Sequence, residues 1–583
     1  MLETALRHHQ AGRLAEAERT YRQILAKDAR HADSLHLLGM IAYQEGRSQA
    51  AVELIRKAID INKNAASYHS NLGTILQAQG KLAEAAAAFE RAVALNPGLA
   101  EAYINFGNVL QALGKLDQAL ACQERALTLK PDCAEACDNL GNVLQDQGKV
   151  DDAVPWHQRA VALKPNYAAG HGNLGNALQK QGQLDAAVAC YERSLALKPD
   201  NADVIYNLGS ALHARENLQE ARACYERALT LKPDYAKASH NLGCLLYALG
   251  DVDQALARHQ EAFALQADYA SARFSASLAQ LCKGDFAAGW HNYDSRWQTK
   301  EHDTPMRAYP QPLWSGEKLA SGRLLIWGEQ GIGDEIMFAG LIPDVIRTGN
   351  RCILDCDVRL KPLFARSFAG IEVVCGHRPD HDSELDFTAH LPSGSLPGLF
   401  RATEAAFAAT ASPYLIADPA VRERFRAAYA GGRRLVGLAW YTKNPKTGRS
   451  RSIDLSSFAP LFARPDIRWV SLQYGDHPAL DEQAAAAGAS ILIDRSVNQF
   501  SDLDVFAAQV AAMDMVLTID NSTAHLVGAL GVPTWLLLPF APDWRWLHKR
   551  EDSPWYPALR IFRQPKLGDW QSVLQRVQRA LDE

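Results

Sequence analysis

Small, hydrophobic and polar positions recur along the first half of the chain with a period of 34 residues. Each period carries an Asn-Leu-Gly or Asn-Phe-Gly triplet, first at Asn71 and last at Asn241. A glycine closes the first half of the unit, at Gly80, Gly114, Gly148, Gly182 and Gly250, with Glu216 in its place once. An alanine lies in the second half and a proline ends most units, at Ala85, Ala119, Ala153, Ala187, Ala221, Ala255, and Pro97, Pro131, Pro165, Pro199, Pro233. Because a loop glycine permits a tight turn and proline cannot continue a helix, this pattern predicts repeated helix–turn–helix units.

This pattern resembles the tetratricopeptide repeat (TPR). We expect eight repeats over residues 1–269, the first two in weaker form around Gly12 and Gly39–Gly46. A degenerate ninth pair, with helices near 270–282 and 286–296, carries large aromatic residues that would seal the stack against the next domain. The predicted TPR superhelix covers residues 1–298. The resemblance implies a right-handed α-solenoid whose concave face holds an extended peptide or a protein surface.

Six successive repeats have asparagine at the same position, at Asn71, Asn105, Asn139, Asn173, Asn207 and Asn241. A solenoid would array these side chains as a ladder, and an amide carries the donor and the acceptor needed to match a peptide bond. The nucleocytoplasmic O-GlcNAc transferases have a similar ladder. In the alternative interpretation, the asparagines only tolerate an exposed site or bond the adjacent helix. Because asparagine is a poor helix former, its repeated use is costly, and we predict peptide binding.

The hydrophobic pattern changes after a Pro-rich and polar segment, residues 299–320, which we interpret as a linker. Short apolar runs then alternate with helical stretches, at 324–327, 352–356, 372–376, 386–390, 434–440, 469–475, 491–495, 515–520 and 534–539, with helices at 502–513 and 522–530. Strands alternating with helices predict parallel sheets. We expect two Rossmann-like subdomains facing a cleft, over residues 321–430 and 431–583, with ligands at the carboxyl ends of the strands.

Three loops fall at those strand ends. The first, Glu329–Glu335, has Gly331 and Gly333, which allow close backbone approach, and Asp334 at the start of a helix. In the plainer interpretation, Asp334 only caps that helix. The loop is neither the dinucleotide fingerprint nor a P-loop, because the residues of those motifs do not follow.

The second loop, Trp440–Ile453, holds four cations, at Lys443, Lys446, Arg449 and Arg451. It suits a diphosphate, because arginine offers bidentate contacts to phosphate oxygens, although a solvated charged loop is the alternative. The third loop begins where a strand ends at Asp520 and a helix follows at once. Its side chains and free backbone amides would bind phosphate oxygens, at Asn521, Ser522, Thr523 and His525, although His525 alone could be a packed helical histidine.

Together, these loops resemble the ADP-heptosyltransferase family of glycosyltransferases, which have the GT-B fold. The run Asp-x-Ser/Thr-x-x-His-x-x-x-Ala-x-Gly-x-Pro, here Asp520 to Pro533, matches the donor-binding motif of that family, and Gly333-Asp334 matches its Gly-Asp. The whole chain is similar to bacterial proteins that join TPRs to such a domain, several of which act in the glycosylation of flagellin and other proteins. Shared segments include EQGIGDE, RSI, DNSTAH and PDWRW.

The resemblance implies a role for each of these residues. Asp334 would be the catalytic base, and Arg451, aided by Lys446 or Arg449, would neutralise the leaving diphosphate. Donor binding would involve Gly331, Gly333, Tyr441, Gln473, Asp520, Asn521, Ser522, Thr523 and His525. Because Gln473 lies at a strand end, we expect it at the nucleotide base or ribose. The resemblance implies inverting transfer without a metal ion or another cofactor, from a nucleotide-diphosphate sugar to Ser or Thr of a protein, such as flagellin, in the TPR groove.

Composition narrows these expectations. A formal net charge of −5 gives no basic surplus for nucleic acid or anionic membrane. None of the ten cysteines forms a CxxC pair, so we expect buried reduced thiols and no zinc site. The N-terminal MLETALRHHQ lacks a signal-peptide core, and no apolar run approaches the roughly 20 residues that span a bilayer, so we expect a cytoplasmic protein. Two other functions stay open: a non-catalytic TPR scaffold with a degenerate transferase domain, and a transferase for lipid or polysaccharide acceptors.

Overall fold

The computed structural model of the chain describes residues 1–583 except 301, 303, 377–384, 410–411, 445–447 and 474–479. It consists of two compact units, Met1–Pro233 and Asp234–Glu583. The second unit therefore begins inside the repeat region, and its last helix pairs belong with the α/β half. The predicted divisions at residues 298, 320 and 430 stay predictions.

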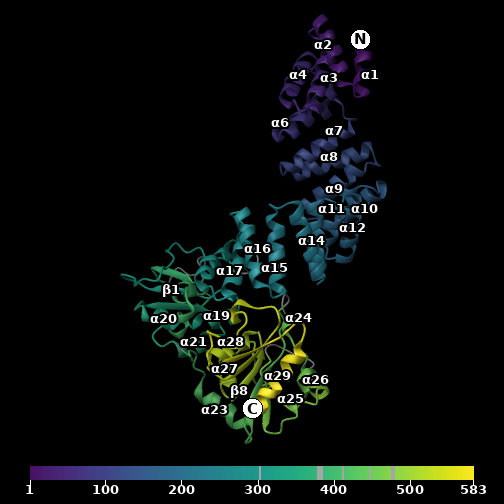
Figure 1. Cartoon of the computed structure of the whole chain (residues 1–583). Coiled ribbons are helices and arrows are strands. Elements are labelled where there is room, and N and C mark those ends of the chain that lie inside the picture. The colour runs from purple at the N-terminus through teal and green to yellow at the C-terminus, as the bar shows by residue number, and fades with distance from the viewer. Residues whose placement is uncertain (301, 303, 377–384, 410–411, 445–447, 474–479) are drawn as a thin grey trace. The chain divides into compact units, whose positions relative to one another are not determined.

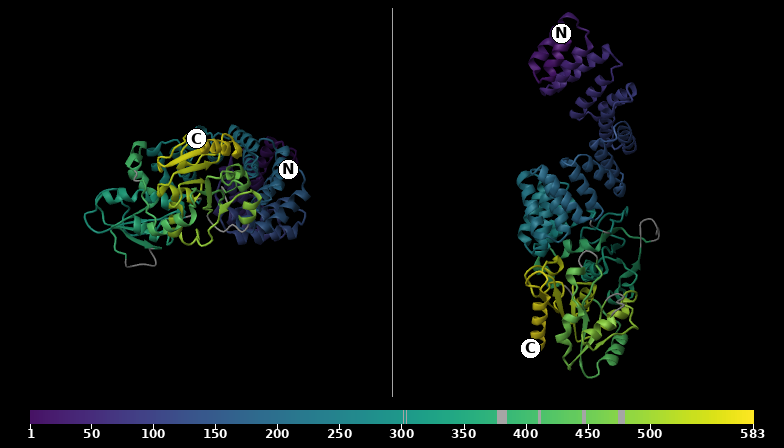
Figure 2. Two further views of the ribbon diagram at one scale, coloured as in Figure 1. Left: turned by 90° about the horizontal axis from the view of Figure 1, so that it is seen from below. Right: turned by 90° about the vertical axis from the view of Figure 1, so that its right-hand side faces the viewer.

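Helix pairs form the whole of residues 1–298, all of which the structure describes, and Figures 1 and 2 show the two helices of a pair lying side by side. The first unit contains α1 (Leu2–Gln10), α2 (Leu14–Lys27), α3 (Ala32–Gln44), α4 (Ser48–Ile61), α5 (Ala66–Ala78), α6 (Leu82–Leu95), α7 (Ala100–Ala112), α8 (Leu116–Leu129), α9 (Ala134–Asp146), α10 (Val150–Leu163), α11 (Ala168–Lys180), α12 (Leu184–Leu197), α13 (Ala202–Ala214) and α14 (Leu218–Leu231). The second contains α15 (Ala236–Ala248), α16 (Val252–Leu265), α17 (Ala270–Cys282), α18 (Phe286–Tyr293) and the 3₁₀ helix η1 (Asp294–Gln298).

Two glycine positions explain the shape of each repeat. The loop glycine takes a left-handed conformation, with φ +77° at Gly182, and even Glu216 is held at φ +64° in its place. The triplet glycine lets the second helix approach closely. A Cβ on Gly175 would lie 2.6 Å from the Cε1 atom of the buried Tyr191 ring. The alanine of the second helix, such as Ala187, is fully buried between the helices.

The last helix pair joins the repeats of the second unit to its α/β half, as its aromatic residues predict. Trp290 donates from Nε1 to the Arg401 carbonyl at 3.0 Å and packs edge-on against Trp544. Arg296 is fully buried, lies over the ring of Trp297, and forms two hydrogen bonds to Glu329, of 2.7 and 3.0 Å. Glu329, in the first glycine-rich loop, therefore ties this loop to the end of the repeats.

The first sheet has four parallel strands in the order β3-β2-β1-β4. They are β1 (Leu324–Trp327), β2 (Cys352–Cys356), β3 (Glu372–Cys375) and β4 (Ala389–Pro392). The helices of this region are α19 (Ile332–Ala339), α20 (Ile342–Arg347), α21 (Lys361–Ser367), α22 (Leu396–Phe400) and α23 (Pro419–Tyr429), with 3₁₀ turns η2 (Ser393–Ser395) and η3 (Glu404–Ala409). The chain proceeds from β1 toward β3 on one side and then returns to place β4 on the other side of β1.

The second sheet has six parallel strands in the order β10-β9-β8-β5-β6-β7. They are β5 (Arg434–Ala439), β6 (Ile467–Ser471), β7 (Ile491–Leu492), β8 (Met515–Ile519), β9 (Thr534–Leu538) and β10 (Leu559–Arg563). Its helical segments are α24 (Gly448–Arg451), η4 (Leu455–Phe458), α25 (Ala459–Phe462), α26 (Leu480–Ala486), α27 (Leu503–Ala511), α28 (Ser522–Ala529), η5 (Trp544–Trp546) and α29 (Trp570–Asp582). The parallel sheets are as predicted, but edge strand β10 was not anticipated.

The segment predicted as a linker packs against the first sheet. Trp314 is buried, and its backbone N–H donates to the His390 carbonyl on β4 at 2.9 Å. Arg307 bonds Asp355 on β2 and lies over the Trp327 ring, with its guanidinium carbon 4.7 Å from the ring centroid. The described part of residues 299–320 therefore contributes side chains to the α/β half.

All ten cysteines are free thiols, and none is fully exposed. Six are buried and four are half-buried, in keeping with the expected reduced thiols. Across the described residues, none of the helices has the length and apolar character required to cross a bilayer.

Candidate functional site

The Gly331–Asp334 loop lies where the first sheet reverses its strand order. It follows β1, whose neighbours are β2 on one side and β4 on the other. Glu329 fixes the start of the loop by accepting the Gly394 backbone N–H beyond β4 at 2.9 Å. A reversal of strand order is the place where open parallel sheets bind ligands.

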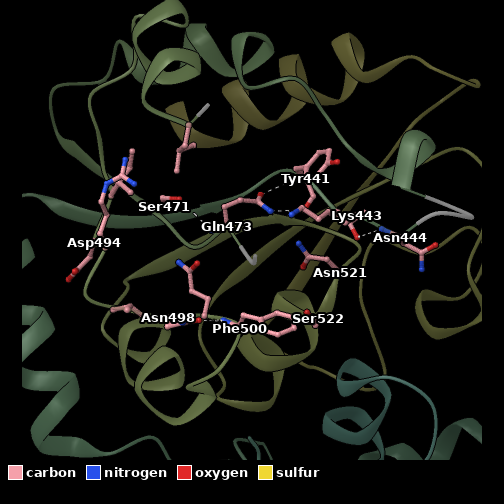
Figure 3. Close-up of a pocket in the computed structure, with 16 residues that line it drawn as sticks. Tyr441, Lys443, Asn444, Ser471, Gln473, Asp494, Asn498, Phe500, Asn521 and Ser522 are labelled. Carbon is pink, nitrogen blue, oxygen red and sulfur yellow. Dashed lines mark hydrogen bonds between the residues drawn. The ribbon is translucent and has the colours of Figure 1, made fainter. Parts of the chain in front are cut away.

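The second sheet reverses between β5 and β8, and a cavity of about 790 Å³ opens at the carboxyl ends of its strands. Segments at four strand ends line it: 441–444 after β5, Ser471 and Gln473 at β6, 493–495 and 497–500 after β7, and Asn521 and Ser522 after β8. Figure 3 shows Gln473, Tyr441, Asn521 and Ser522 around this cavity. Its ionisable lining residues are Tyr441, Lys443, Asp494 and Arg495.

The N-terminus of α28 borders this cavity. The Asn521 side chain caps the helix by accepting the Ala524 N–H at 3.2 Å. Asn521 Nδ2 and Thr523 Oγ1 are buried, yet neither has a hydrogen-bond partner among the described residues. Unpaired buried donors cost free energy, and together with the helix N-terminus they form a suitable place for anionic oxygens.

The two sheets meet through α19 and α28. A Cβ added to Gly333 would come within 3.0 Å of His525 Cδ2 and 3.5 Å of the Ser522 Cα. Only glycine permits this approach without movement of its neighbours. The two sequence motifs that contain Gly333 and His525, nearly 200 residues apart in the chain, are therefore in direct contact.

Predicted residues from both sheets join one ion-pair cluster. Asp334 accepts a hydrogen bond from Arg545 Nε at 2.8 Å. Arg545 also contacts Asp543, which pairs with Arg451 at 3.0 Å. Arg451 in turn lies 2.9 Å from Asp520. The cluster of Asp334, Arg545, Asp543, Arg451 and Asp520 thus contains three carboxylates and two guanidinium groups.

Burial raises the pKa values of Asp520 and Asp543, and the two arginines lower them. Burial raises the pKa of Asp520 above its usual range, because the nearby Arg451 offsets desolvation only in part. Burial also opposes ionisation of Asp543, but Arg545 and Arg451 outweigh it and lower the pKa of Asp543 to about 2. Asp543 therefore holds the two guanidinium groups between Asp334 and Asp520 at neutral pH.

His525 is held rigidly beside this cluster. Its ring stacks on Trp546, with centroids 4.9 Å apart, and its Nδ1 atom lies 2.9 Å from the Tyr556 hydroxyl. Burial, followed by the charge of Arg545, lowers the pKa of His525 to about 3. The imidazole is neutral at physiological pH, so it would contact a ligand by hydrogen bonding rather than as a cation.

The remaining predicted donor residues differ in their surroundings. The amide of Gln473 bonds the backbone of the loop after β5, through the N–H groups of Trp440 and Tyr441 and the Tyr441 carbonyl. Figure 3 shows Gln473 beside Tyr441. Gln473 therefore shapes the cavity wall, and its contact with a nucleotide stays a prediction. Arg449 is exposed, and Lys446 lies outside the described residues.

Sequence reasoning missed Arg545 and Asp543, which connect the predicted residues. Both belong to the PDWRW segment, which the resemblance contains but to which no role was given. It also missed Glu335, next to Asp334. Glu335 accepts the Asp357 backbone N–H at 2.9 Å, and burial raises its pKa to about 7.

The asparagine ladder of the first unit has a mixed role. Asn71, Asn173 and Asn207 donate to or contact side chains of the preceding repeat, namely His36, Asp138 and Asn176, at 2.8 to 2.9 Å. Asn105 and Asn139 make no side-chain hydrogen bond within the described residues. A groove of about 630 Å³ is lined by Gln111, Asn142, Gln145, Asp146, Asn176, Gln179, Lys180 and Asn207. Asn142 and Asn176, three residues after ladder positions, are a second amide row that the sequence analysis overlooked.

Comparison with known proteins supports the repeat half directly. TPR family models match residues 2–67 and 173–236, residues 64–132, 98–166 and 132–200, and residues 236–267. The N-terminal part of the chain therefore consists of TPRs, as predicted. Protein FlbA of Caulobacter vibrioides is 34% identical over 335 residues, which cover 53% of this chain and 54% of that protein. The chain spans about half the length of this curated relative.

Two solved structures have a partial likeness to this chain. YrrB, described as a TPR protein with an unusual peptide-binding site, has 29% identity and a TM-score of 0.28, over 33% of this chain and 98% of that chain. The APC/C hetero-tetramer Cut9–Hcn1 has 18% identity and a TM-score of 0.38, over 45% of this chain and 52% of that chain.

Proposed function

We propose that the chain is a cytoplasmic protein glycosyltransferase, which moves a sugar from a nucleotide-diphosphate sugar to Ser or Thr of a protein held by its TPRs. The main support is the meeting of Asp334 with Arg451, Asp520 and His525, which come from separate loops yet surround one contact between the two sheets. In this proposal the two sheets are the halves of a GT-B fold, and the cavity of the second sheet receives the nucleotide.

The proposed transfer assigns the base to the first sheet and the donor to the second. Asp334 accepts the proton of the acceptor hydroxyl, whose oxygen attacks the anomeric carbon of the sugar. The bond from that carbon to the diphosphate breaks, with inversion, and the nucleoside diphosphate leaves. Arg545 holds the Asp334 carboxylate in place through its Nε contact of 2.8 Å.

Stabilising the leaving diphosphate requires more than the paired arginines. Arg451 and Arg545 are shared among three carboxylates, so their charge is already matched. The donor would gain its remaining stabilisation from the N-terminus of α28 and from the cationic loop after β5, which brings Lys443 to the cavity. We propose that no metal ion or other cofactor is needed.

In the same proposal, the groove of amide side chains selects the acceptor. Asparagine and glutamine side chains pair with the donors and acceptors of an extended backbone without reading its side chains. Flagellin is the first acceptor to test, because the bacterial proteins that this chain resembles include flagellin glycosyltransferases.

A second candidate is a non-catalytic TPR scaffold. The closed network of three carboxylates and two guanidinium groups favours it, because such a network also serves as a purely structural contact between the sheets. In that case no nucleotide sugar binds, and the repeats alone carry the function.

The test is a thermal-shift screen of UDP-, GDP-, ADP- and CMP-sugars on the full chain, followed by mass spectrometry of flagellin incubated with the stabilising donor. A bound donor stabilises the folded state by mass action. We expect stabilisation and a mass gain of one or more sugars. Stabilisation without transfer to flagellin would leave the acceptor open, whereas no stabilisation by any donor would favour the scaffold.

Shortening the chain separates a protein acceptor from a lipid or polysaccharide acceptor. The cut belongs after Pro233, at the boundary between the two compact units. A cut after residue 269 would remove α15 and α16, whose Gly250 loop packs on Phe540. Loss of protein modification with retained donor binding would support the TPR groove as the acceptor site. Undiminished transfer to a glycan would contradict it.

A further inference from the structure

Two histidines and a cysteine converge in the first repeat of the second unit. His240 and Cys244 lie one turn apart on α15, and His259 lies opposite them on α16. The Nδ1 atoms of the two histidines are 3.2 Å apart, and Cys244 Sγ is 3.7 Å from His240 Nε2. One ligand atom from each residue lies within 4.8 Å of the other two.

The repeat register shows that this set is unusual. Exactly three periods earlier, Asp138, Asn142 and His157 occupy the same positions. There the histidine Nδ1 bonds the Asp138 carboxylate at 2.7 Å, and Tyr167 and Asn173 donate to the other carboxylate oxygen. In that repeat, the buried histidine therefore has a strong hydrogen-bond acceptor, and its Nδ1 atom needs no other partner.

At the later repeat, the acceptor is replaced by a second imidazole and the asparagine by a thiol. His240 and His259 are both buried. An imidazole nitrogen and the polarisable sulfur of Cys244 are both ligands that suit a transition metal ion. The Asp138–His157 pair offers no equivalent of that sulfur.

The spacing of the two imidazole nitrogens matches that of two ligands in a tetrahedral site. Two nitrogen ligands at about 2.0–2.1 Å from zinc would be separated by about 3.3 Å in a tetrahedron, near the 3.2 Å found here. Because Cys244 Sγ lies beside Nε2 of His240, three ligand atoms meet at one centre only if the half-buried Cys244 or the His240 ring turns. Gly243 makes room for this arrangement, because a Cβ there would lie only 2.7 Å from His259 Nδ1.

We propose that His240, Cys244 and His259 bind a divalent transition metal ion of the zinc type. The thiolate and the two imidazoles supply three ligands, and a fourth position remains for water or another group. By the repeat register, Cys244 corresponds to Asn142 and Asn176, which line the groove of the first unit. This proposal is independent of the transferase activity.

The test is titration of the full, chelator-treated chain with CoCl₂, read by its visible absorption, and with ZnCl₂, read by thermal shift. We expect one equivalent of Co²⁺ to give ligand-field bands of a four-coordinate site and a thiolate-to-cobalt charge-transfer band. Zn²⁺ should displace the cobalt and raise the melting temperature.

Earlier repeats show which residues are tolerated at the positions of Cys244 and His259. Cys244→Asn places the residue found at Asn142, and His259→Gln places the residue found at Gln123. We expect each variant to stay folded, to lose the charge-transfer or ligand-field signal, and to bind Co²⁺ at least tenfold more weakly. Cys190→Ser, at another half-buried thiol, is the matched control and should bind as the unaltered chain does.

Two results would overturn the proposal. One is the absence of the charge-transfer band in the unaltered chain. The other is Co²⁺ affinity that is the same in the unaltered chain, Cys244→Asn and His259→Gln, because binding would then occur elsewhere. Circular dichroism of each variant separates loss of ligands from loss of fold.

Discussion

The repeats and the α/β half achieve contact between distant residues in different ways. In the repeats, Gly175 and Tyr191 meet because the same short helix–turn–helix unit is built again in each period. In the α/β half, Asp334 and Arg545 meet although they are 211 residues apart. The contacts of the repeats thus form within short sequence segments and recur in each period. The candidate site forms only when the two sheets are correctly packed together.

This difference has a consequence for the polar residues of each region. In the repeats, an amide such as Asn173 bonds one neighbour, and the loss of one contact leaves the other repeats intact. In the α/β half, Asp543 and Arg545 each serve two partners, so a single change disturbs the whole cluster. Substitutions should therefore have larger effects in the α/β half than in the repeats.

The largest expected effect is on transfer, in Asp334→Asn. The amide keeps the shape of the carboxylate and its contact with Arg545 but cannot accept the proton, so we expect kcat to fall by about 10²–10⁴-fold. Steady-state transfer assays measure this loss. Asp357→Asn, which removes an acid paired with Arg359 near the same sheet, should retain activity. Equal activity in both variants would remove Asp334 from the mechanism.

Arg451 requires a gentler substitution. Its two partners, Asp520 and Asp543, would lose their cation in Arg451→Ala, so that variant should be destabilised as well as inactive. Arg451→Lys keeps the charge but not the two-pronged geometry. We expect it to fold, with weaker donor binding, and a fully active Arg451→Lys would contradict a bidentate role.

The next effect is on stability, at the buried pair Arg296–Glu329. Arg296→Met leaves Glu329 buried without its cation, and we expect a loss of about 3–5 kcal/mol in the free energy of unfolding of the second unit. Chemical denaturation followed by tryptophan fluorescence measures it. Arg222→Met, at the exposed pair with Glu226 in the repeats, should cost less than about 0.5 kcal/mol. Similar losses of unfolding free energy at both pairs would contradict the expectation that substitutions have larger effects in the α/β half than in the repeats.

A smaller effect concerns pH. Burial raises the pKa of Glu335 to about 7 from 4.5, so the folded state binds more protons than the unfolded state between these values. Below about pH 4.5, where Glu335 is protonated in both states, its burial costs no ionisation. The folded state loses stability as the pH rises through 7 and the buried carboxyl must ionise. Glu335→Gln should reduce the decline in unfolding free energy between pH 5 and pH 8 by roughly 1–3 kcal/mol. An unchanged decline would show that Glu335 is ionised in the folded protein.

The smallest effect separates the two roles of the asparagine ladder. Asn173→Ala removes an inter-repeat hydrogen bond and should cost about 1 kcal/mol of stability. Asn105→Ala and Asn139→Ala should leave stability nearly unchanged but weaken acceptor binding, measured by fluorescence anisotropy of a labelled acceptor peptide. Unchanged binding in the double variant would favour a purely structural ladder.

The sequence predicted the repeats well because each helix is specified by nearby residues. The 34-residue period, the loop glycines and the terminal prolines are local signals, and even Glu216 takes the conformation of the glycine it replaces. Most strands were predicted from apolar runs. Strand β10 was not, because its run contains Arg560 and Arg563 and resembles an exposed segment.

The candidate site was predicted only in part. The loops with Asp334 and Asp520 carry recognisable motifs, but no local pattern indicates that Arg545 connects Asp334 to Asp543. Likewise, the lack of a CxxC pair led us to expect no zinc site, whereas His259 comes close to Cys244 through the packing of two helices. Contacts that depend on tertiary packing need the structure.

Calorimetric titration of the full chain with UDP, GDP, ADP and CDP tests most directly whether the α/β half is a nucleotide-sugar site. The proposal predicts that at least one nucleotide binds with one-to-one stoichiometry. It also predicts that Lys443→Ala, which removes one of the two cationic side chains lining the cavity, weakens this binding several-fold while the fold is kept. If none of the four binds at millimolar concentration, the α/β half is not the donor site proposed, and the scaffold becomes the better account of the protein.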